Sequence, residues 1–209
     1  YIKRVPIDTY RTQHRGGKGV LGMATREDDA LMDLAVVDTH ETLFFFSNRG
    51  RVYPLRAFQI SSNTSRTTRG APLVSLLPLG RGEQVQAMLA IKNPKEDDYQ
   101  LILATKLGEI KALKTGQLTN IRPSGLIVMD LEQGDELVSV GQADDTRDVI
   151  MVSEQGQAIK FQVSGLTPRS RSAGGVRGMR LLGDDRVVAM GIVAPNTHLL
   201  IVSQNGYGK

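Results

Sequence analysis

A glycine-rich turn near the start of the chain carries residues that could bind an anionic ligand. Its sequence, Q-H-R-G-G-K-G, comprises Gln13, His14, Arg15, Gly16, Gly17, Lys18 and Gly19. The glycines allow positive φ angles and a close approach of the backbone to a partner, and Arg15 and Lys18 add fixed positive charge. Such a loop suits the phosphates of an extended, negatively charged polymer. An ordinary solvated turn has the same composition, and that alternative stays open at this point.

Comparable loops recur further along the chain. They are R-T-T-R-G at 66–70, I-R-P-S-G at 121–125 and A-G-G-V-R-G at 173–178, and each is followed by apolar residues. The turn at 13–19 has three glycines, as many as the loop at 173–178, and two basic residues. A loop that recurs in register with apolar segments favours a shared role over a set of unrelated turns.

Positive charge is concentrated in two segments. The formal net charge is +4 and the pI is about 9.4. Residues 47–82 and 157–180 contain basic but no acidic side chains, whereas acidic clusters lie at 27–29, 96–98 and 144–148. Because a solvated surface usually mixes its signs, this segregation predicts a basic face. The further candidate contacts, all lysine or arginine, are Arg51, Arg66, Arg69, Lys111, Arg122, Lys160, Arg169, Arg171, Arg177 and Arg180.

Composition excludes several other classes of protein. The chain has 209 residues, 40% of them hydrophobic, and no run of 18 apolar residues, so we expect a sizeable core and no membrane-spanning helix. Without cysteine there is no disulfide or thiolate chemistry, which is compatible with a reducing cytoplasm. The histidines are scattered and no acid/base pair or catalytic triad is recognisable, so we expect neither a metal site nor an independent enzyme. The first residues lack an initiator Met and an apolar signal core, so we expect an excised segment.

Apolar runs that end in glycine repeat along the chain. They end at Gly50, Gly108, Gly156 and Gly206, at intervals of 58, 48 and 50 residues. A second strand-like stretch follows each glycine, and residues 1–9 fit the same position. We therefore expect one domain over residues 1–209, with repeat periods 1–50, 51–108, 109–156 and 157–206.

Each period shows four strand signals. In the second period they lie at 51–58, 71–79, 84–91 and 100–107, where apolar and β-branched residues are bounded by turn residues. Residues 27–37 have some helical character, but we interpret them as a turn plus a strand because their counterparts are strand-like. Four strands in about 50 residues, repeated, predict an all-β, propeller-like fold of four-stranded blades. The alternative is a β-sandwich or a stack of hairpins.

Two kinds of polar residue recur at fixed positions in the periods. Hydroxyls end the apolar runs (Ser47, Thr105, Ser153 and Ser203), and acids precede the third strand (Asp29, Glu83, Asp135 and Asp184). A nucleophile would not appear four times in register, so we expect the hydroxyls to be structural. In the F-F-F run, the alternation of strand side chains places Phe45 on the face opposite Phe44 and Phe46.

Three segments resemble one known family. They are Y-I-K-R-V-P-I-D-T-Y-R-T-Q-H-R-G-G-K-G (1–19), T-H-E-T-L-F-F-F-S-N-R-G-R-V-Y (39–53) and Q-N-G-Y-G-K (204–209). In this order and spacing they are similar to the C-terminal domain of the A subunit of bacterial DNA gyrase. The turn at 13–19 matches that family's gyrase-A box, usually Q-R-R-G-G-R/K-G, with His14 in place of the second-position arginine. The resemblance covers the whole chain.

The resemblance implies a fold and a function. The family's domain is a six-bladed β-pinwheel, a propeller-like disc whose hairpins are exchanged between neighbouring blades, and it wraps double-stranded DNA around a positively charged rim. By this resemblance the chain carries about four of the six blades, and the basic residues named above contact DNA. We expect it to help DNA gyrase, a type II DNA topoisomerase, to introduce negative supercoils.

The resemblance also implies partners and a location. The partners in the holoenzyme are the gyrase B subunit, the remainder of the gyrase A subunit, and DNA, and we expect the isolated domain to be monomeric. The cleaving tyrosine and the ATPase lie outside this segment, so we expect no cofactor here, while ATP and Mg act elsewhere in the holoenzyme. The expected location is the bacterial cytoplasm, at the nucleoid. Two alternatives stay open: the equivalent domain of the topoisomerase IV A subunit, which normally lacks an intact box, and a propeller that serves as a protein-interaction platform.

Overall fold

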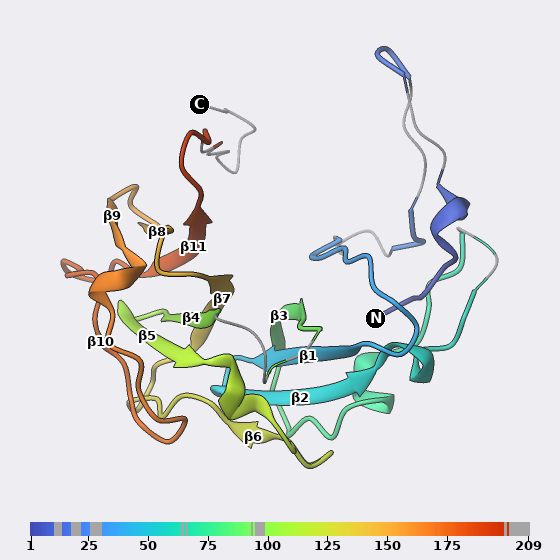
Figure 1. Cartoon of the computed structure of the whole chain (residues 1–209), viewed down its shortest axis with the longest axis horizontal. Helices are drawn as coiled ribbons and strands as arrows, with labels where there is room; N and C mark the ends of the chain where they lie inside the picture. Colours follow the sequence, from blue (N-terminus) through green and yellow to red (C-terminus); the bar gives the residue numbers. More distant parts are fainter. Residues whose placement is uncertain are drawn as a thin grey trace. The chain divides into compact units, whose positions relative to one another are not determined.

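Apolar runs bounded by glycine turns form strands along most of the chain (Figure 1). The computed structural model describes residues 1–10, 14–17, 22–25, 31–63, 65, 67–92, 94, 99–198 and 200. Its strands are β1 (Thr42–Ser47), β2 (Arg51–Arg56), β3 (Val85–Ala90), β4 (Gln100–Thr105), β5 (Glu109–Lys114), β6 (Leu126–Ile127), β7 (Leu137–Ala143), β8 (Asp148–Ser153), β9 (Ala158–Gln162), β10 (Val176–Arg177) and β11 (Val187–Val193). Short 3-10 helices lie between them: η1 (Ile7–Thr9), η2 (Ala57–Gln59), η3 (Leu73–Ser75), η4 (Thr115–Leu118) and η5 (Val163–Gly165). The described residues contain no α-helix, so the prediction of an all-β fold is confirmed.

The first structural unit comprises residues 1–94 and 120–127. It holds one antiparallel sheet in the order β3-β1-β2-β6. The hairpin of β1 and β2 forms the middle of this sheet. The outer strand β6 pairs with β2 through Leu126 and Val52, so residues from a later repeat complete the sheet.

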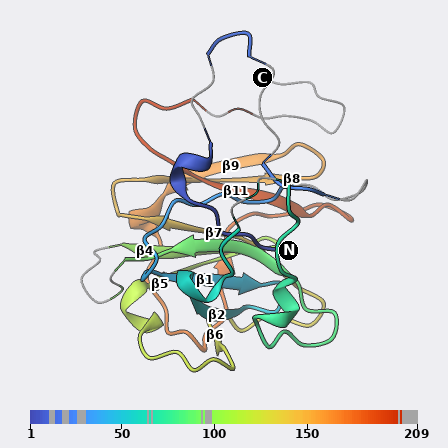
Figure 2. The ribbon, with the colours of Figure 1, turned by 90° about the vertical axis from the view of Figure 1, so that its right-hand side faces the viewer.

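The second structural unit comprises residues 95–119 and 128–209. It holds a four-stranded sheet, β10-β5-β4-β7, and a three-stranded sheet, β11-β8-β9. Figure 2 shows β11 of one sheet next to β7 of the other. A Cβ atom at Gly141 of β7 would lie 2.7 Å from the Cγ1 atom of Ile192 of β11, so the two sheets pack closely because glycine occupies this position.

Strand exchange follows the same register in successive repeats. The paired residues are Val52 with Leu126, Ile110 with Val176 and, as an isolated antiparallel bridge, Ile2 with Ala71. Val52 and Ile110 each stand two residues after a repeat glycine, and Ile2 is the second residue of the chain. Sheets that share strands between successive repeats confirm the prediction of a propeller-like β-pinwheel.

The second strand expected in each period is shorter than predicted. Residues 71–79 pair only at Ala71 and then form η3. Pro72 and Pro78 interrupt this stretch, and proline has no N–H group to donate to a ladder. The corresponding strands β6 and β10 have only two residues each. The strand over 71–79 is therefore a wrong prediction, and the exchanged segment is mostly loop.

The strand expected within residues 27–37 is also wrong for the part that the structure describes, residues 31–37. This stretch contains no regular element. Its large apolar side chains Leu31, Met32, Leu34 and Val36 are exposed. The pattern is that of an inner strand, but no described strand pairs with it, and a strand needs a partner ladder to be stable.

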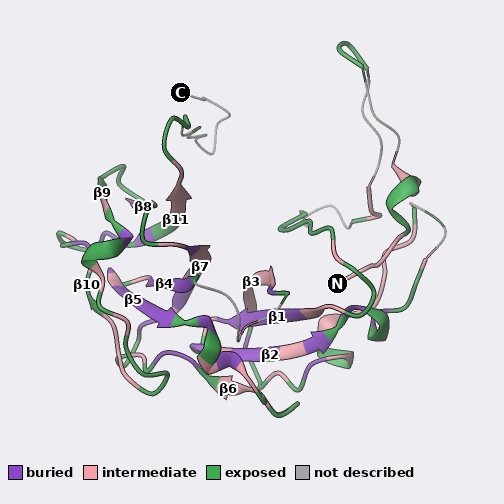
Figure 3. Ribbon diagram, viewed as in Figure 1, coloured by how far each residue is buried: buried purple, intermediate pink, exposed green. Residues whose placement is uncertain are grey.

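Both units bury the apolar side chains of their hairpins, as Figure 3 shows for β1, β2, β4 and β5. In the first unit, Leu43 and Phe45 of β1 belong to one cluster together with Tyr53 of β2. Phe44 and Phe46 are equally buried, on the other face of β1 because strand side chains alternate. The predicted orientation of Phe45 is thus confirmed, and β1 is covered on both faces.

A buried acid closes the hairpin turn of the first unit. The Oε1 atom of Glu83 accepts the hydroxyl groups of Ser47 at 2.5 Å and of Tyr53 at 2.9 Å, and Oε2 accepts the N–H group of Gly80 at 2.8 Å. Burial alone would raise the pKa of Glu83, but these hydrogen bonds and the charge of Arg49 hold it below its usual value. The acid therefore stays ionised inside the turn.

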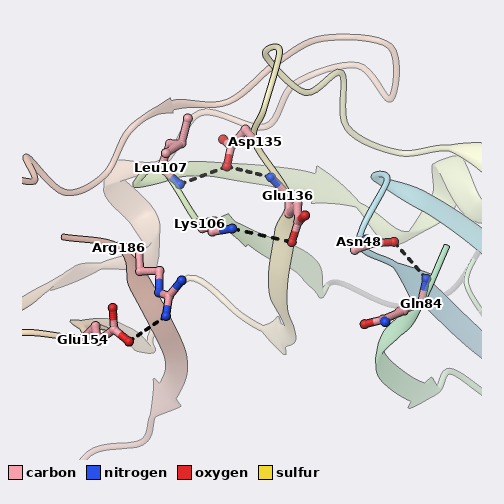
Figure 4. Close-up of polar contacts among 8 residues, drawn as sticks. All are labelled: Asn48, Gln84, Lys106, Leu107, Asp135, Glu136, Glu154 and Arg186. Carbon is pink, nitrogen blue, oxygen red and sulfur yellow. Dashed lines mark hydrogen bonds and ion pairs between the residues drawn. The ribbon is translucent and has the colours of Figure 1, made fainter. Parts of the chain in front are cut away.

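Asp135 has the same position in the second unit. Its Oδ1 atom accepts the N–H groups of Leu107 at 2.9 Å and Glu136 at 2.8 Å (Figure 4). Thr105 ends β4 as Ser47 ends β1, and its hydroxyl oxygen accepts the N–H group of Glu109 at 3.1 Å. The expectation that these recurring hydroxyls are structural is confirmed for both residues.

In the three-stranded sheet the turn acid is Asp185 rather than Asp184. Asp184 is exposed, whereas Asp185 is buried and accepts the N–H groups of Gln155 at 3.1 Å and Arg186 at 2.9 Å. Burial alone would raise the pKa of Asp185, but these bonds and one from the Ser153 hydroxyl hold it below its usual value. The expected position was wrong by one residue, because two neighbouring acids point to opposite sides of the turn.

Candidate nucleic-acid interface

Several of the basic candidates lie on the loops that exchange strands between repeats. In the first unit, residues 120–127 lead into β6, which pairs with β2. In the second unit, residues 166–177 lead into β10, which pairs with β5. Each loop lies along the outer strand of a sheet, where no further described strand covers it. This topology places the loop side chains at an edge that a ligand reaches.

The glycine-rich turn is described from His14 to Gly17. The N–H group of Gly17 donates to the carbonyl of His14 at 3.0 Å, and Gly16 has a φ of +83°. All four residues, Arg15 included, are exposed. A Cβ atom at Gly16 would meet no atom within 4 Å, so glycine is required there for its backbone conformation rather than for space. Gln13, Lys18 and Gly19, like Arg66 of a later loop, lie outside the described residues.

Arg122 lies at the tip of the exchanged loop of the first unit. The N–H group of Gly125 donates to the Arg122 carbonyl at 2.9 Å, which closes a turn and leaves Arg122 exposed. Gly125 has a φ of +82°, and a Cβ atom there would lie 2.5 Å from the ring of Tyr53. Arg51 is half-buried and its guanidinium donates to the carbonyl of Ser124 at 3.2 Å. Arg122 therefore faces solvent, whereas Arg51 holds the loop.

Arg69 is partly buried against the first residues of the chain. Its guanidinium carbon lies 3.9 Å from the centroid of the Tyr1 ring, a cation–π contact. Lys3 donates from its ammonium to the carbonyls of Ser65 at 3.2 Å and Thr68 at 3.1 Å on the same loop. These contacts fix the loop against Tyr1 and Lys3. Because its guanidinium already packs on the Tyr1 ring, Arg69 is a weaker candidate for DNA contact than Arg122.

The exchanged loop of the second unit, with β10 and the residues directly after it, presents four exposed arginines: Arg169, Arg171, Arg177 and Arg180. Arg169 donates to the carbonyls of Gly174 at 3.3 Å and Gly175 at 3.1 Å. Among the described residues, no carboxylate forms an ion pair with any of the four. Their charge is therefore available to an anionic ligand.

Lys160 of β9 is exposed but shares its charge with an acid. Its ammonium lies 3.0 Å from the Oδ2 atom of Asp148. Exposed pairs of this kind are weak, so a phosphate could compete with the carboxylate. Lys160 is a weaker candidate than the loop arginines for this reason.

Lys111 was expected to contact DNA, and the structure contradicts that expectation. Its side chain lies on β5 and the residue is only 1% exposed. Its ammonium donates to the carbonyls of Val128 at 2.7 Å, Arg171 at 3.0 Å and Ala173 at 2.7 Å. β5 is buried on both faces, so a basic residue within it points into the protein whichever way it faces. Lys111 therefore cannot reach a phosphate.

Burial lowers the pKa of Lys111 to about 8. The charge of Arg169 acts in the same direction and that of Asp130 opposes it. The ammonium form still dominates at neutral pH. Its three N–H donors match the three carbonyl acceptors, which is how the protein tolerates a buried charge without a carboxylate partner.

Two residues that the sequence analysis missed also hold these loops. Gln117 of η4 donates to the carbonyl of Arg169 at 3.1 Å and accepts the N–H group of Arg171 at 2.9 Å. Lys3 occupies the repeat position of Lys111, and aligning the repeats would have revealed it. Gln117 had no comparable signal, because a glutamine in a polar turn has no distinctive pattern.

Fixed positive charge and N–H donors are what this arrangement offers chemically. Within the part of the chain that the structure describes, no group of three or more His, Asp or Glu residues could hold a metal ion. Over the same residues, no helix is long and apolar enough to cross a membrane. The geometry suits electrostatic binding of an anionic polymer along the loops.

Comparison with known proteins decides the family. The model of the DNA gyrase C-terminal domain, beta-propeller, matches residues 1–38, 41–92, 99–144, 147–194 and 197–209. The chain belongs to the DNA gyrase C-terminal domain family. The last four matched segments begin 58, 48 and 50 residues apart, which is also the spacing of the repeat glycines.

Individual relatives agree with this assignment to the gyrase family. The A subunit of DNA gyrase from Dehalogenimonas lykanthroporepellens is 38% identical over 209 residues, which cover 100% of this chain and 26% of that protein. A solved DNA gyrase A C-terminal domain has a TM-score of 0.77 at 30% identity, covering 100% of this chain and 67% of that one. The C-terminal domain of DNA topoisomerase IV has a TM-score of 0.82 at 22% identity, over 100% of this chain and 63% of that one, a likeness of fold alone.

Proposed function

We propose that this gyrase-family domain binds duplex DNA without sequence preference and wraps it along its basic loops, so that DNA gyrase can introduce negative supercoils. The observation that carries the proposal is the set of exposed arginines on the exchanged loops: Arg122 in the first unit and Arg169, Arg171, Arg177 and Arg180 in the second. Membership of the gyrase C-terminal domain family supports it.

The chemistry of these loops suits phosphates better than base edges. A guanidinium group forms paired hydrogen bonds with phosphate oxygens and keeps its charge at any physiological pH. Reading bases in the major groove takes a helix or a two-stranded ribbon that enters the groove. The described loops offer instead the two-residue strands β6 and β10 and irregular backbone. Binding should therefore be independent of sequence.

Wrapping requires contacts on successive loops. Curving a 20 to 30 bp duplex smoothly by 40 to 90° costs about 1 to 6 kcal/mol, which only additional contacts along the path offset. Basic loops that recur with the repeat supply such contacts. Duplexes long enough to span several loops should consequently bind better than very short ones.

In this proposal the reaction belongs to the assembled enzyme. The chain covers 26% of a related A subunit of DNA gyrase. The remainder of that polypeptide and the gyrase B subunit supply DNA cleavage and ATP hydrolysis, with ATP and Mg bound there. This domain acts at the nucleoid in the bacterial cytoplasm as an accessory DNA-binding part without a catalytic residue of its own.

A gel-shift titration at several salt concentrations tests the proposal. If about six phosphates are neutralised, log K should fall with log[salt] at a slope near −5. Duplexes of equal length and unrelated sequence should bind equally well. A flat salt response, which a protein-interaction platform would give, contradicts the proposed function.

A further inference from the structure

One side chain of β5 and one of η4 contact the backbone of the exchanged loop of the second unit where it carries arginines. Lys111 of β5 donates to the carbonyls of Arg171 and Ala173, at 3.0 and 2.7 Å. Gln117 of η4 donates to the carbonyl of Arg169 at 3.1 Å and accepts the N–H group of Arg171 at 2.9 Å. Both residues thus fix the direction of the chain at the positions that carry arginines.

We propose that Lys111 and Gln117 are positioning residues for DNA binding: they hold the backbone of residues 169–175 so that Arg171 and Arg177 face an approaching duplex. Neither residue touches DNA itself. The inference rests on the proposed DNA-binding function of this domain.

Individual hydrogen bonds, rather than a strand ladder, order this loop. Residues 169–175 contain no strand, and they include Gly174 and Gly175, which lose much conformational entropy when they are fixed. Backbone bonds run from the N–H group of Arg169 to the carbonyl of Ala112 at 2.9 Å, from Ala173 to Ser170 at 3.1 Å and from Asp130 to Ala173 at 3.2 Å. The guanidinium of Arg169 also donates to the carbonyls of Gly174 and Gly175. Without Lys111, the carbonyls of Val128 and Arg171 would lose this donor, and the loop would rearrange to satisfy them.

The first unit repeats the device. Lys3 stands at the repeat position of Lys111, and its ammonium donates to the carbonyls of Ser65 and Thr68, at 3.2 and 3.1 Å. Those carbonyls belong to the exchanged loop that leads to Ala71. A lysine that points at loop carbonyls in two repeats indicates a shared way of seating the loop rather than an isolated contact.

The ammonium of Lys111 faces few other charged groups. Arg169 of the loop disfavours its charged form, whereas Asp130, which follows β6, favours it. Glu109 of the same strand accepts the N–H group of Gly175 at 3.2 Å, so it contributes to the same loop. The loop is thus held by Lys111, Gln117 and Glu109 from outside and by Arg169 from within, which leaves Arg171 and Arg177 free of that task.

Duplex binding by two single variants of the whole protein tests the inference. Gln117→Ala removes a partly exposed side chain and should fold normally, while circular dichroism and thermal unfolding check that Lys111→Met folds. We expect each variant to weaken duplex affinity about fivefold, as for the loss of one or two hydrogen bonds. The matched controls Gln162→Ala and Lys114→Met change exposed residues of the same unit and should stay within about twofold of the original affinity. Should Lys111→Met fail to fold, the Gln117→Ala result decides.

A double-mutant cycle separates positioning from a general structural effect. In a protein that already carries Arg171→Ala and Arg177→Ala, Gln117→Ala should cause no further loss, because it acts through those arginines. A fivefold loss that persists in this background, or an unchanged affinity of the single variant, would overturn the inference. If the unmodified protein does not bind duplex DNA, the proposed function itself fails, so the two failures are distinct.

Discussion

In the two units, the residue directly after the repeat glycine contacts the exchanged loop through opposite charges. In the first unit Arg51 donates to the carbonyl of Ser124, at 3.2 Å. In the second unit Glu109 accepts the N–H group of Gly175, also at 3.2 Å. Arg51 and Glu109 each follow a repeat glycine directly, so they occupy the same position. At this repeat position one loop is therefore contacted by a cationic donor and the other by an anionic acceptor.

This difference decides which charges remain available. The loop at 120–127 uses Arg51 for its own seating and presents a single exposed arginine, Arg122. Residues 169–180 of the second unit carry four exposed arginines, and of these only Arg169 donates to loop carbonyls. Equal topology thus does not imply equal affinity for DNA, and we expect the loop of the second unit to contribute more.

The largest effect on function is expected from the glycine-rich turn, whose position in the repeat series is the earliest of the basic loops. Replacing Arg15 and Lys18 by alanine removes two phosphate contacts, so duplex binding should weaken only moderately while DNA bending is lost. In gyrase that carries this variant, negative supercoiling of relaxed plasmid should be abolished and ATP-dependent relaxation retained. A plasmid topology assay and a bend-sensitive fluorescence assay measure the two properties.

Two further variants make this result specific. Gly17→Val should also impair bending, because a side chain would keep the backbone of the turn away from the phosphates. Lys114→Ala, which removes an exposed charge from β5, should leave supercoiling intact. Normal bending and supercoiling by the double alanine variant would mean that residues 13–19 are only a solvated turn.

The next largest effect is expected on duplex affinity when the arginines of either loop are replaced. Replacing Arg169, Arg171, Arg177 and Arg180 by alanine should weaken duplex binding on the order of 10² to 10³-fold at physiological salt and make the salt slope shallower by about 3.6. Arg122→Ala should cost less than about tenfold and change the slope by about 0.9. Gel-shift titrations give both numbers. Equal losses of affinity would contradict the expectation that the loop of the second unit contributes more to DNA binding.

The fold was easier to predict from the sequence than the site, and the reasons are local. Apolar runs that end in glycine predicted β1, β4 and β8, because this pattern needs only neighbouring residues to define a hairpin. The stretch at 71–79 looked like a strand in composition, but Pro72 and Pro78 prevent a ladder. Patterns of apolar residues thus located the hairpins and not the exchanged segments.

The site depended on burial that composition does not encode. Lys111 and Arg171 are both basic and both close to a glycine, yet one is buried among carbonyls and the other is exposed. The two residues differ because Lys111 lies on a strand that is covered on both faces. The exchanged loop of the next repeat provides part of this cover. The charge clusters therefore located loops that carry exposed arginines, but they did not distinguish exposed basic residues from those that hold the loops.

A smaller effect, on the free energy of unfolding, should distinguish glycines required only for a positive φ from glycines required also for lack of space. Gly134→Ala forces an alanine to adopt a φ of +84° with no atom within 4 Å, so it should lower the free energy of unfolding by about 1 kcal/mol. Gly125→Ala adds a clash with the Tyr53 ring, which should cost about 1 to 3 kcal/mol more. Urea unfolding measures both variants. Equal losses would show that the loop at 120–127 moves away from Tyr53 without cost, which would contradict its close seating.

The smallest effect is expected at a polar pair whose chemistry changes from sheet to sheet (Figure 4). The side-chain pairs are Asn48 with the N–H group of Gln84 at 2.9 Å, Lys106 with Glu136 at 4.0 Å, and Glu154 with Arg186 at 2.7 Å. The backbone bond between the same partners is constant, because the N–H groups of Asn48, Lys106 and Glu154 each donate at 2.8 Å to the carbonyls of Gln84, Glu136 and Arg186. The side chains are thus neutral in one sheet. In the other two sheets they are charged, with the basic and acidic residues exchanged between the two strands.

Because the backbone bond persists while the side-chain charges change, the ladder rather than the ion pair should align the third strand. The side chains of Lys106 and Glu136 are 32% and 47% exposed, so water and salt screen their attraction. Replacing them together by Met and Gln should therefore change the free energy of unfolding by less than about 0.5 kcal/mol. Urea unfolding at low and high salt measures this, with Gly134→Ala, which is expected to lower the free energy of unfolding at either salt concentration, as the comparison. Exposed ion pairs rarely contribute as much as about 1 kcal/mol. A loss of unfolding free energy above about 1 kcal/mol that high salt abolishes would therefore contradict this prediction and show that the ion pair aligns the third strand in the second unit.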